Sequence, residues 1–211
     1  MFGIHQNTIY TKLFILVSQV IEMNIAGIIT HSAGWSNISI VVIWTMIGIT
    51  FLRLNAMMFI WLPRGISWRE AIGNSLAFAL YYIGFPMLVR SEIYTPILIL
   101  GILLFVIGGA INTTAELLRR PFKANPKNKG HLYTGGLFHY AVHINYFGDV
   151  LWVLGFALCT MNPWALVIPA LLLLFFVTNY IPTANRYLRK KYGKEFVTYE
   201  ANTKQLIPWV W

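Results

Sequence analysis

The sequence has 211 residues, of which 57% are hydrophobic and only 11% are charged. A soluble domain carries roughly 25% charged residues, so this chain has too few polar side chains to cover a globular surface in water. Sixteen Lys and Arg residues against seven Asp and Glu residues give a formal net charge of +9. In a membrane protein this excess more often reflects orientation, anionic lipid headgroups or an anionic ligand. We therefore expect an integral membrane protein and no nucleic-acid partner.

Hydrophobic runs of membrane-spanning length recur along the chain. A helix needs about 20 mostly apolar residues to cross roughly 30 Å of hydrocarbon. Six runs meet or approach this length: 10–30, 38–62, 72–91, 94–112, 146–161 and 163–181. The last two are short, and Pro163 in the turn between them suits the first turn of a helix. The pattern predicts an all-α polytopic bundle of about six transmembrane helices, within a range of five to seven, in a single membrane domain over 1–211.

Positive charge gathers on one side of this predicted topology. Arg64 and Arg69 follow the second run, five cations lie in 113–135, and six lie in 183–204. The intervening loops carry little charge. The positive-inside rule therefore places both termini in the cytoplasm, and we expect multi-pass insertion in a bacterial inner membrane.

The C-terminal segment 183–200 has a different pattern. Leu188, Tyr192, Phe196 and Tyr199 recur near helical spacing, and cations cover the rest. This pattern is typical of an amphipathic helix at the membrane interface, and Gly193 is placed to kink or break it. Anchoring to membrane lipids explains the pattern as well as ligand binding does.

Two polar pairs occupy i,i+4 positions, so each pair shares one helix face. Asn112 and Glu116 close the fourth run, and Asn145 and Asp149 open the fifth. Carboxylates beside a membrane span are costly unless they are paired, hydrated or functional. Helix capping and interfacial polarity are the plainer explanation for both pairs.

The segment between these pairs is rich in cations, amides, glycines and tyrosines. Gly135 and Gly136 would permit close approach of the backbone to a ligand. Cations suit phosphates, amides and carboxylates suit ribose, and tyrosine suits stacking. These ingredients favour a phosphorylated aromatic cofactor, although a lipid phosphate would use the same groups.

Three stretches carry a family resemblance: GGAINTTAELLRR, GGLFHYAVHINYFGDVLWVLGFAL and NRYLRKKYGKEFVTYEANTKQLIPWVW. Together they resemble the C-terminal domain of the steroid 5α-reductase family and its bacterial DUF1295-like relatives. The same superfamily contains sterol reductases and isoprenylcysteine carboxyl methyltransferases. The resemblance implies a cofactor-binding half at 108–211 and substrate-side helices in 1–107.

In that family these stretches form a cytoplasm-facing NADPH pocket that passes hydride to an enone lying among the helices. Transfer position by position implies a set of cofactor-binding residues, which comprises Arg64, Asn112, Glu116, Arg120, Lys123, Asn145, Asp149, Asn185 and Tyr187. Glu116 stands where the family usually has Asp, and Asp149 stands where it usually has Glu.

The implied catalytic candidates are Glu22, His143 and Tyr146. Glu22 matches the family's substrate-side carboxylate by helix order, and its alternative role is an ion pair with Arg53. His143 is expected to form a hydrogen bond beside the cofactor. The family's HYxHR-like segment, whose tyrosine helps to polarise the substrate carbonyl, has no clear equivalent in this chain. We expect no metal site, because His139 and His143 alone are too few ligands.

The resemblance favours an NADPH-dependent reductase that acts on a lipid-like double bond in a steroid, enone or isoprenoid. The first alternative is a methyltransferase that uses S-adenosylmethionine on a lipid or prenylated substrate. Such enzymes typically carry an RHPxY run and a double glutamate, and this chain has Asn185-Arg186-Tyr187 at the corresponding place, without a glutamate pair. The second alternative is a lipid-binding membrane protein without enzymatic activity.

Overall fold

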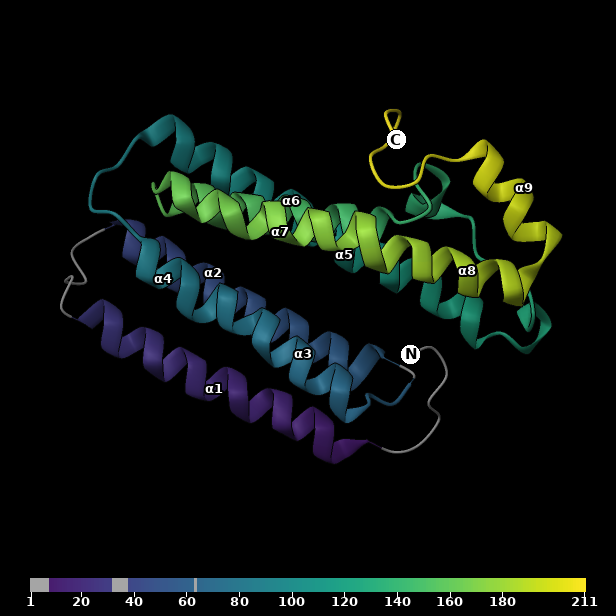
Figure 1. Cartoon of the computed structure of the whole chain (residues 1–211), viewed down its shortest axis with the longest axis horizontal. Coiled ribbons are helices and arrows are strands. Elements are labelled where there is room, and N and C mark those ends of the chain that lie inside the picture. The colour runs from purple at the N-terminus through teal and green to yellow at the C-terminus, as the bar shows by residue number, and fades with distance from the viewer. Residues whose placement is uncertain (1–7, 32–37, 63) are drawn as a thin grey trace. The chain divides into compact units, whose positions relative to one another are not determined.

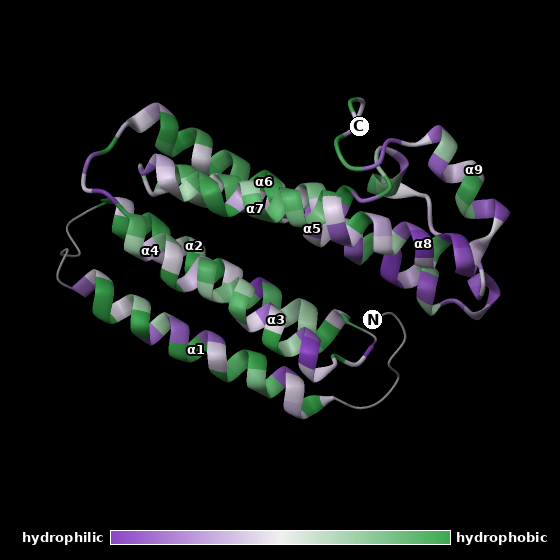
Figure 2. Ribbon diagram, viewed as in Figure 1, coloured by the Kyte–Doolittle hydropathy of each residue, from purple (hydrophilic) through white to green (hydrophobic). Residues whose placement is uncertain are grey.

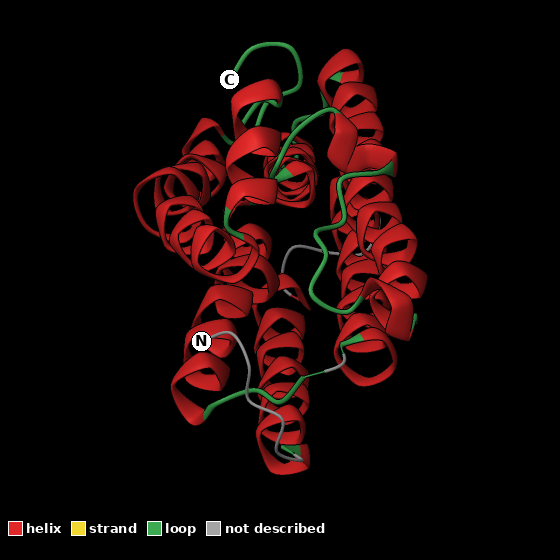
Figure 3. Ribbon diagram, turned by 90° about the vertical axis from the view of Figure 1, so that its right-hand side faces the viewer, coloured by secondary structure: helices red, strands yellow, loops and turns green. Residues whose placement is uncertain are grey.

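The computed structural model describes residues 8–31, 38–62 and 64–211. Within these ranges the chain is helical, and no strand occurs (Figures 1 and 3). Among the described residues, five helices are long and apolar enough to cross a membrane: Ile9–His31, Ile38–Trp61, Trp68–Leu88, Thr95–Ala124 and Pro163–Tyr192. The sixth predicted span is a shorter apolar helix, Ile144–Cys159, whose 16 residues cover about 24 Å at 1.5 Å per residue. The prediction of a polytopic helical bundle is confirmed.

The chain divides into two compact units, each described here by itself. Unit 1 comprises 1–102 and 155–168, and unit 2 comprises 103–154 and 169–211. In unit 1, α1 (Ile9–His31) packs along the helical stretch that begins with α3 (Trp68–Ala79) and ends with α4 (Phe85–Leu88). α2 (Ile38–Ala56) continues into a π-helical turn, Met57–Trp61.

Local sequence signals explain where helices in unit 1 begin. The side chain of Ser67 accepts a hydrogen bond from the backbone N–H of Glu70 at 3.2 Å, which caps the N-terminus of α3. Ser-x-x-Glu is the sequence of a capping box. At the predicted 160–163 turn, Asn162 accepts from the N–H of Trp164 at 3.1 Å, and Pro163 opens a 3-10 turn. This predicted helix start is confirmed.

Unit 2 contains parts of α5 (Thr95–Ala124), α6 (Ile144–Cys159) and α7 (Val167–Phe175), followed by α8 (Ile181–Tyr192) and α9 (Lys194–Asn202). Two glycines let α5 and α6 touch. A Cβ on Gly148 would lie 2.6 Å from the backbone nitrogen of Asn112, and one on Gly108 would lie 2.3 Å from that of Trp152. Small residues allow such backbone approach between helices in a membrane. The close contact between α5 and α6 sets the position of the polar residues beside it, such as Asn112.

The fourth span was predicted to end at residue 112, but α5 continues to Ala124. The fall in hydrophobicity after Asn112 marks a change of environment and not the end of the helix. Pro121 lies in the last turn, where the N–H of Asn125 still donates to its carbonyl at 3.2 Å. Cations such as Lys123 are favoured near a helix C-terminus by the macrodipole. Asn112 and Glu116 therefore lie inside a helix and do not close it.

The predicted amphipathic segment 183–200 is two helices. α8 continues the last apolar helix through a π-helical turn, Phe176–Tyr180, so its basic residues extend a span. Gly193 ends α8 with φ +53°, and α9 begins at Lys194. A positive φ favours glycine, so the predicted break at Gly193 is confirmed. Figure 2 shows the hydrophilic colour gathering on α8 and α9, in contrast to the hydrophobic α7.

Candidate functional site

Four side chains form a cluster where α5 and α6 touch, and we call Asn112, Glu116, Arg119 and Asn145 the amide–carboxylate cluster. The buried Asn112 amide donates to the main-chain carbonyl of Asn145 at 3.1 Å. The Asn145 amide in turn donates to Glu116 Oε1 at 3.2 Å. Arg119 donates to the other carboxylate oxygen of Glu116. Asn112 and Glu116 from the first predicted pair and Asn145 from the second are thus brought together by hydrogen bonds between α5 and α6.

Further predicted residues flank this cluster. The indole N–H of Trp152 donates to Asp149 Oδ1 at 2.9 Å, one turn along α6 from Asn145. On α5, Arg120 and Lys123 are exposed. Lys123 Nζ lies 2.6 Å from the hydroxyl of Tyr192 and 4.8 Å from the centroid of its ring. The α5 end is therefore attached to α8 through a cation–π contact.

His143 belongs to a second hydrogen-bond system, the His143–Asn185 network. Asn185 Nδ2 donates to Glu200 Oε1 and to Gln205 Oε1, each at 3.0 Å. Both amide hydrogens are thereby used, and Asn185 Oδ1 accepts from His143 Nε2 at 2.7 Å. Burial lowers the pKa of His143, and the Asn185 hydrogen bond and the charge of Glu200 offset this only in part. His143 is consequently a neutral ring with its proton on Nε2 at pH 7.

The C-terminal segment completes this network, which sequence reasoning had reached only at Asn185 and His143. Glu200 Oε2 accepts from Arg189 Nε at 3.0 Å and from its NH2 group at 2.8 Å. The backbone N–H of His143 donates to the Gln205 carbonyl at 2.9 Å. Asn185 and Arg189 are spaced i,i+4 on α8 and therefore share one helix face. This spacing can be recognised in the sequence. Glu200 and Gln205 follow a helix break, so no periodicity points to them.

The remaining predicted residues of unit 2 lie beside these two groups. Tyr146 stacks between His143 and Phe176, with ring centroids 5.2 Å and 4.6 Å away. The hydroxyl of Tyr187 accepts from Lys191 Nζ at 3.2 Å. Gly136 has φ +55°, but a Cβ there would meet Leu118 at 2.9 Å. The Gly135-Gly136 turn therefore serves close packing within the chain.

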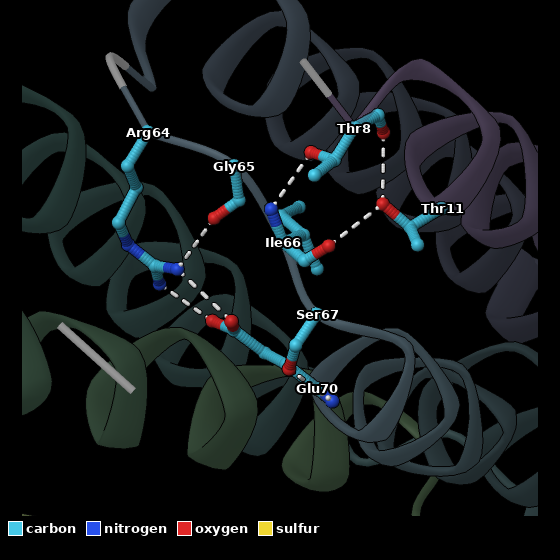
Figure 4. A network of polar contacts seen from close by, with 7 residues as sticks. All are labelled: Thr8, Thr11, Arg64, Gly65, Ile66, Ser67 and Glu70. Carbon is cyan, nitrogen blue, oxygen red and sulfur yellow. Dashed lines mark hydrogen bonds and ion pairs between the residues drawn. The ribbon is translucent and has the colours of Figure 1, made fainter. Parts of the chain in front are cut away.

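Arg64 lies in unit 1 and is held by Glu70. Its two terminal nitrogens form a bidentate ion pair with that carboxylate, one at 2.9 Å, and NH1 also donates to the Gly65 carbonyl at 3.0 Å. Figure 4 shows this pair beside a second set of hydrogen bonds, in which Thr8 and Thr11 hold the backbone of Ile66. Cofactor binding by Arg64 stays a prediction.

Glu22, also in unit 1, lies next to a buried group that the sequence did not predict. Glu22 is 8% exposed, and its Oε2 has no hydrogen-bond partner among the described residues. One turn earlier on α1, Gln19 Oε1 accepts from the Tyr82 hydroxyl at 3.1 Å and from the Asn55 amide at 3.0 Å. Tyr82 lies in a π-helical turn, Leu80–Gly84; such turns are frequent at functional sites. In the sequence, the sign of this buried group is that the amides Gln19 and Asn55 lie inside apolar runs.

Histidines 139 and 143 do not share a helix face. His139 ends a 3-10 turn, Gly136–His139, and His143 precedes α6. No group of three or more His, Cys, Asp or Glu side chains arranged for metal binding occurs within the described ranges.

These helices define an α-helical integral membrane protein whose C-terminal unit carries two polar networks. Residues 74–203 match the model of the family described as "Protein of unknown function (DUF1295)", and the chain belongs to this family. The predicted resemblance is thus confirmed.

Curated relatives carry two kinds of name. "3-oxo-5-alpha-steroid 4-dehydrogenase 2" of Sus scrofa is 31% identical over 140 residues, 66% of this chain and 53% of the relative. The Homo sapiens protein of that name is 31% identical over 111 residues, which are 53% of this chain and 42% of the relative. "Probable O-methyltransferase ustE" of Ustilaginoidea virens is 28% identical over 157 residues, which are 70% of this chain and 49% of the relative. The chain spans about half the length of the curated relatives it matches.

Proposed function

We propose that this protein is a membrane-embedded reductase that uses NADPH to reduce a carbon–carbon double bond in a lipid-like steroid, enone or isoprenoid. The observation that carries the proposal is the amide–carboxylate cluster, in which Asn145 and Glu116 join two helices at 3.2 Å. The similarity to relatives named as steroid dehydrogenases supports the same reading. In this proposal both termini face the cytoplasm of a bacterium, where NADPH is available.

The residues present fit a dinucleotide. Asn112, Glu116, Arg120 and Lys123 follow one another at intervals of four, four and three residues along α5, which places them along one side of the helix. Amide and carboxylate groups suit ribose and carboxamide, and the exposed cations beyond them suit phosphates. The buried hydroxyl of Thr113 has no hydrogen-bond partner among the described residues. A buried polar atom of this kind, next to Asn112 in sequence, is consistent with a polar ligand at this part of α5.

When bound, NADPH would supply a hydride. The chain's own groups would hold and orient the reactants. We assign Asn112, Asn145 and Glu116 to the cofactor, with Arg119 fixing the Glu116 carboxylate. His143 is assigned to positioning, because its Nε2 proton is already given to Asn185.

Two further side chains, Tyr82 and Glu22, are assigned to the substrate. The Tyr82 hydroxyl donates a hydrogen bond to Gln19 in this structure. In the proposed reaction it would donate instead to the carbonyl oxygen of the substrate and polarise that carbonyl. Glu22, with a buried carboxylate oxygen that lacks a hydrogen bond among the described residues, would hold the proton that completes the reduction. General acid catalysis requires a donor within hydrogen-bond reach of the substrate and a pKa suited to the working pH.

A methyltransferase is the second candidate, favoured by the relative named as a probable O-methyltransferase. S-adenosylmethionine also carries a ribose and an aromatic base, so it would use the same amides and carboxylate. S-adenosylmethionine has no phosphate groups, so it would not neutralise the positive charges of Arg120 and Lys123 at the end of α5. This difference favours NADPH.

Ligand-dependent unfolding of the purified protein in detergent separates the two candidates, because a bound ligand stabilises the folded state by mass action. We expect NADPH to raise the Tm by more than S-adenosylmethionine does. Asn145→Ala should lose this NADPH shift, while Asn202→Ala should keep it. Asn202 is the matched control, an exposed amide whose one side-chain hydrogen bond within the described residues goes to the Thr198 carbonyl one turn back. Stabilisation by S-adenosylmethionine alone would refute the reductase.

A further inference from the structure

A pocket of about 470 Å³ lies within unit 2, between α8 with its preceding π-helical turn and the C-terminal segment. One part of its wall is apolar and the other part is polar. The apolar wall is formed by Val177, Ile181, Pro182 and Trp211, and the polar wall is formed by Asn185, Arg186, Arg189 and Gln205. The pocket is amphipathic. Along the helix that lines it, the apolar residues come first and the two arginines come after them.

The polar wall offers one guanidinium to a ligand. Arg189 is already held by Glu200, and the Asn185 amide is used by the His143–Asn185 network. Arg186 is exposed and forms no hydrogen bond or ion pair in the part of the chain that the structure describes. No acidic side chain belongs to the described residues that line the pocket. An anion would therefore be attracted by Arg186 without displacing an internal partner.

The apolar wall determines what kind of anion fits. Val177 and Ile181 lie one turn apart in Pro163–Tyr192, a helix apolar and long enough to cross a membrane. A lipid chain can follow that wall while its headgroup reaches Arg186 one turn further along α8. Indole rings such as that of Trp211 are enriched at the level of the headgroups, and basic pockets between helices bind lipid phosphates.

We propose that this pocket binds the phosphate headgroup of an anionic membrane lipid, with Arg186 contacting the phosphate and the acyl chain lying along Val177 and Ile181. The site differs from the amide–carboxylate cluster, and the inference does not rest on the proposed reductase activity. Because Arg189 is paired with Glu200, Arg186 is the cation of the pocket that is left to contact a phosphate. Guanidinium groups form strong charge-assisted hydrogen bonds with phosphate.

The test compares wild type, Arg186→Gln and Lys190→Gln in mixed micelles that contain either phosphatidylglycerol or phosphatidylcholine. Lys190 is an exposed cation on α8 that does not line the pocket, so it controls for loss of charge. We expect phosphatidylglycerol to raise the Tm of wild type on the order of 5 °C above phosphatidylcholine. Arg186→Gln should weaken the apparent affinity for phosphatidylglycerol on the order of tenfold, and Lys190→Gln should change it little.

Lipid retained by the wild-type protein in native mass spectrometry is the second measurement, because it does not depend on a variant. Phosphatidylglycerol should be retained in preference to phosphatidylcholine. Equal effects of the two substitutions, or no preference between the lipids, would overturn the proposal. Inorganic phosphate and NADPH, added without lipid, distinguish the source of the phosphate. If either reproduces the Arg186-dependent stabilisation, the pocket serves a soluble phosphate and the lipid proposal is wrong.

Discussion

The side-chain amide of Asn145 on α6 donates to the carboxylate of Glu116 on α5 at 3.2 Å, across 29 residues of sequence. The link exists because Gly108 and Gly148 let the two helices touch, so a packing feature determines the geometry of a polar site. Arg119 holds the second carboxylate oxygen. The cluster is therefore rigid before any ligand binds, and preorganisation of this kind lowers the cost of binding.

Gly148→Ala tests the dependence of the site on the helix contact. The added Cβ would lie 2.6 Å from the backbone nitrogen of Asn112, so α5 and α6 must move apart. Overpacking of this kind costs about 1–3 kcal/mol, and NADPH-dependent stabilisation should fall with it. Gly73→Ala is the matched control, because a Cβ there meets nothing within 4 Å. Equal stability of the two variants, measured by thermal unfolding in the same detergent, would show that the contact is not needed.

The stability of the protein should decrease in mild acid through His143. Burial lowers the pKa of His143 below its ordinary value of 6.5, so the unfolded chain binds the proton more readily than the folded protein. The contribution of neutral His143 is present above about pH 6.5 and is lost as the pH falls toward the lower folded pKa. We expect Tm to fall as the pH is lowered below about 6.5, and His143→Gln to flatten this slope. An unchanged slope in the variant would contradict the assignment.

Arg64 and Glu70 should be coupled in stability. Their side chains are 27% and 14% exposed, and a bidentate pair at this depth should couple by about 1 kcal/mol in a double-mutant cycle of Arg64→Ala and Glu70→Ala. The same variants test the predicted cofactor role. If Arg64 also contacts NADPH, Arg64→Ala should weaken NADPH binding more than Glu70→Ala does. Equal NADPH affinity in both variants would leave Arg64 a structural residue.

Tyr82→Phe removes the hydroxyl that donates to Gln19. On the proposed mechanism it should lower kcat for an enone on the order of a hundredfold, as expected for loss of one hydrogen-bond donor to the reacting carbonyl, with NADPH affinity unchanged. Tyr94→Phe is the control, since Tyr94 is 63% exposed. The measurement is enone-dependent NADPH oxidation in a panel of steroid and isoprenoid substrates. Equal rates in both variants would exclude Tyr82 from the reaction.

The sequence predicted the helices well because hydrophobic length is a direct physical requirement of the bilayer. The end of α5 was mistaken because loss of hydrophobicity reports where a helix leaves lipid and not where its hydrogen bonds stop. The family resemblance assigned Asn145 and Glu116 to the cofactor separately. Their hydrogen bond to each other was not predicted, since residues on different helices have no common periodicity. Tyr82 was missed because an aromatic residue in an apolar run reads as packing.

Glu200 and Gln205 were missed for a related reason. Their role depends on the fold of the C-terminal segment against the start of α6, where the backbone N–H of His143 donates to the Gln205 carbonyl. Such a long-range backbone contact leaves no pattern in the sequence. His143 itself was predicted as catalytic, and its hydrogen bond to Asn185 favours a positioning role.

Direct titration of NADPH fluorescence with the purified protein tests the central claim, that the amide–carboxylate cluster binds this cofactor. We expect saturable binding to wild type, and binding weakened on the order of tenfold or more in Asn145→Ala, with Asn202→Ala unchanged. Wild-type protein that binds S-adenosylmethionine but gives no NADPH signal, or Asn145→Ala that binds NADPH as wild type does, would contradict the claim.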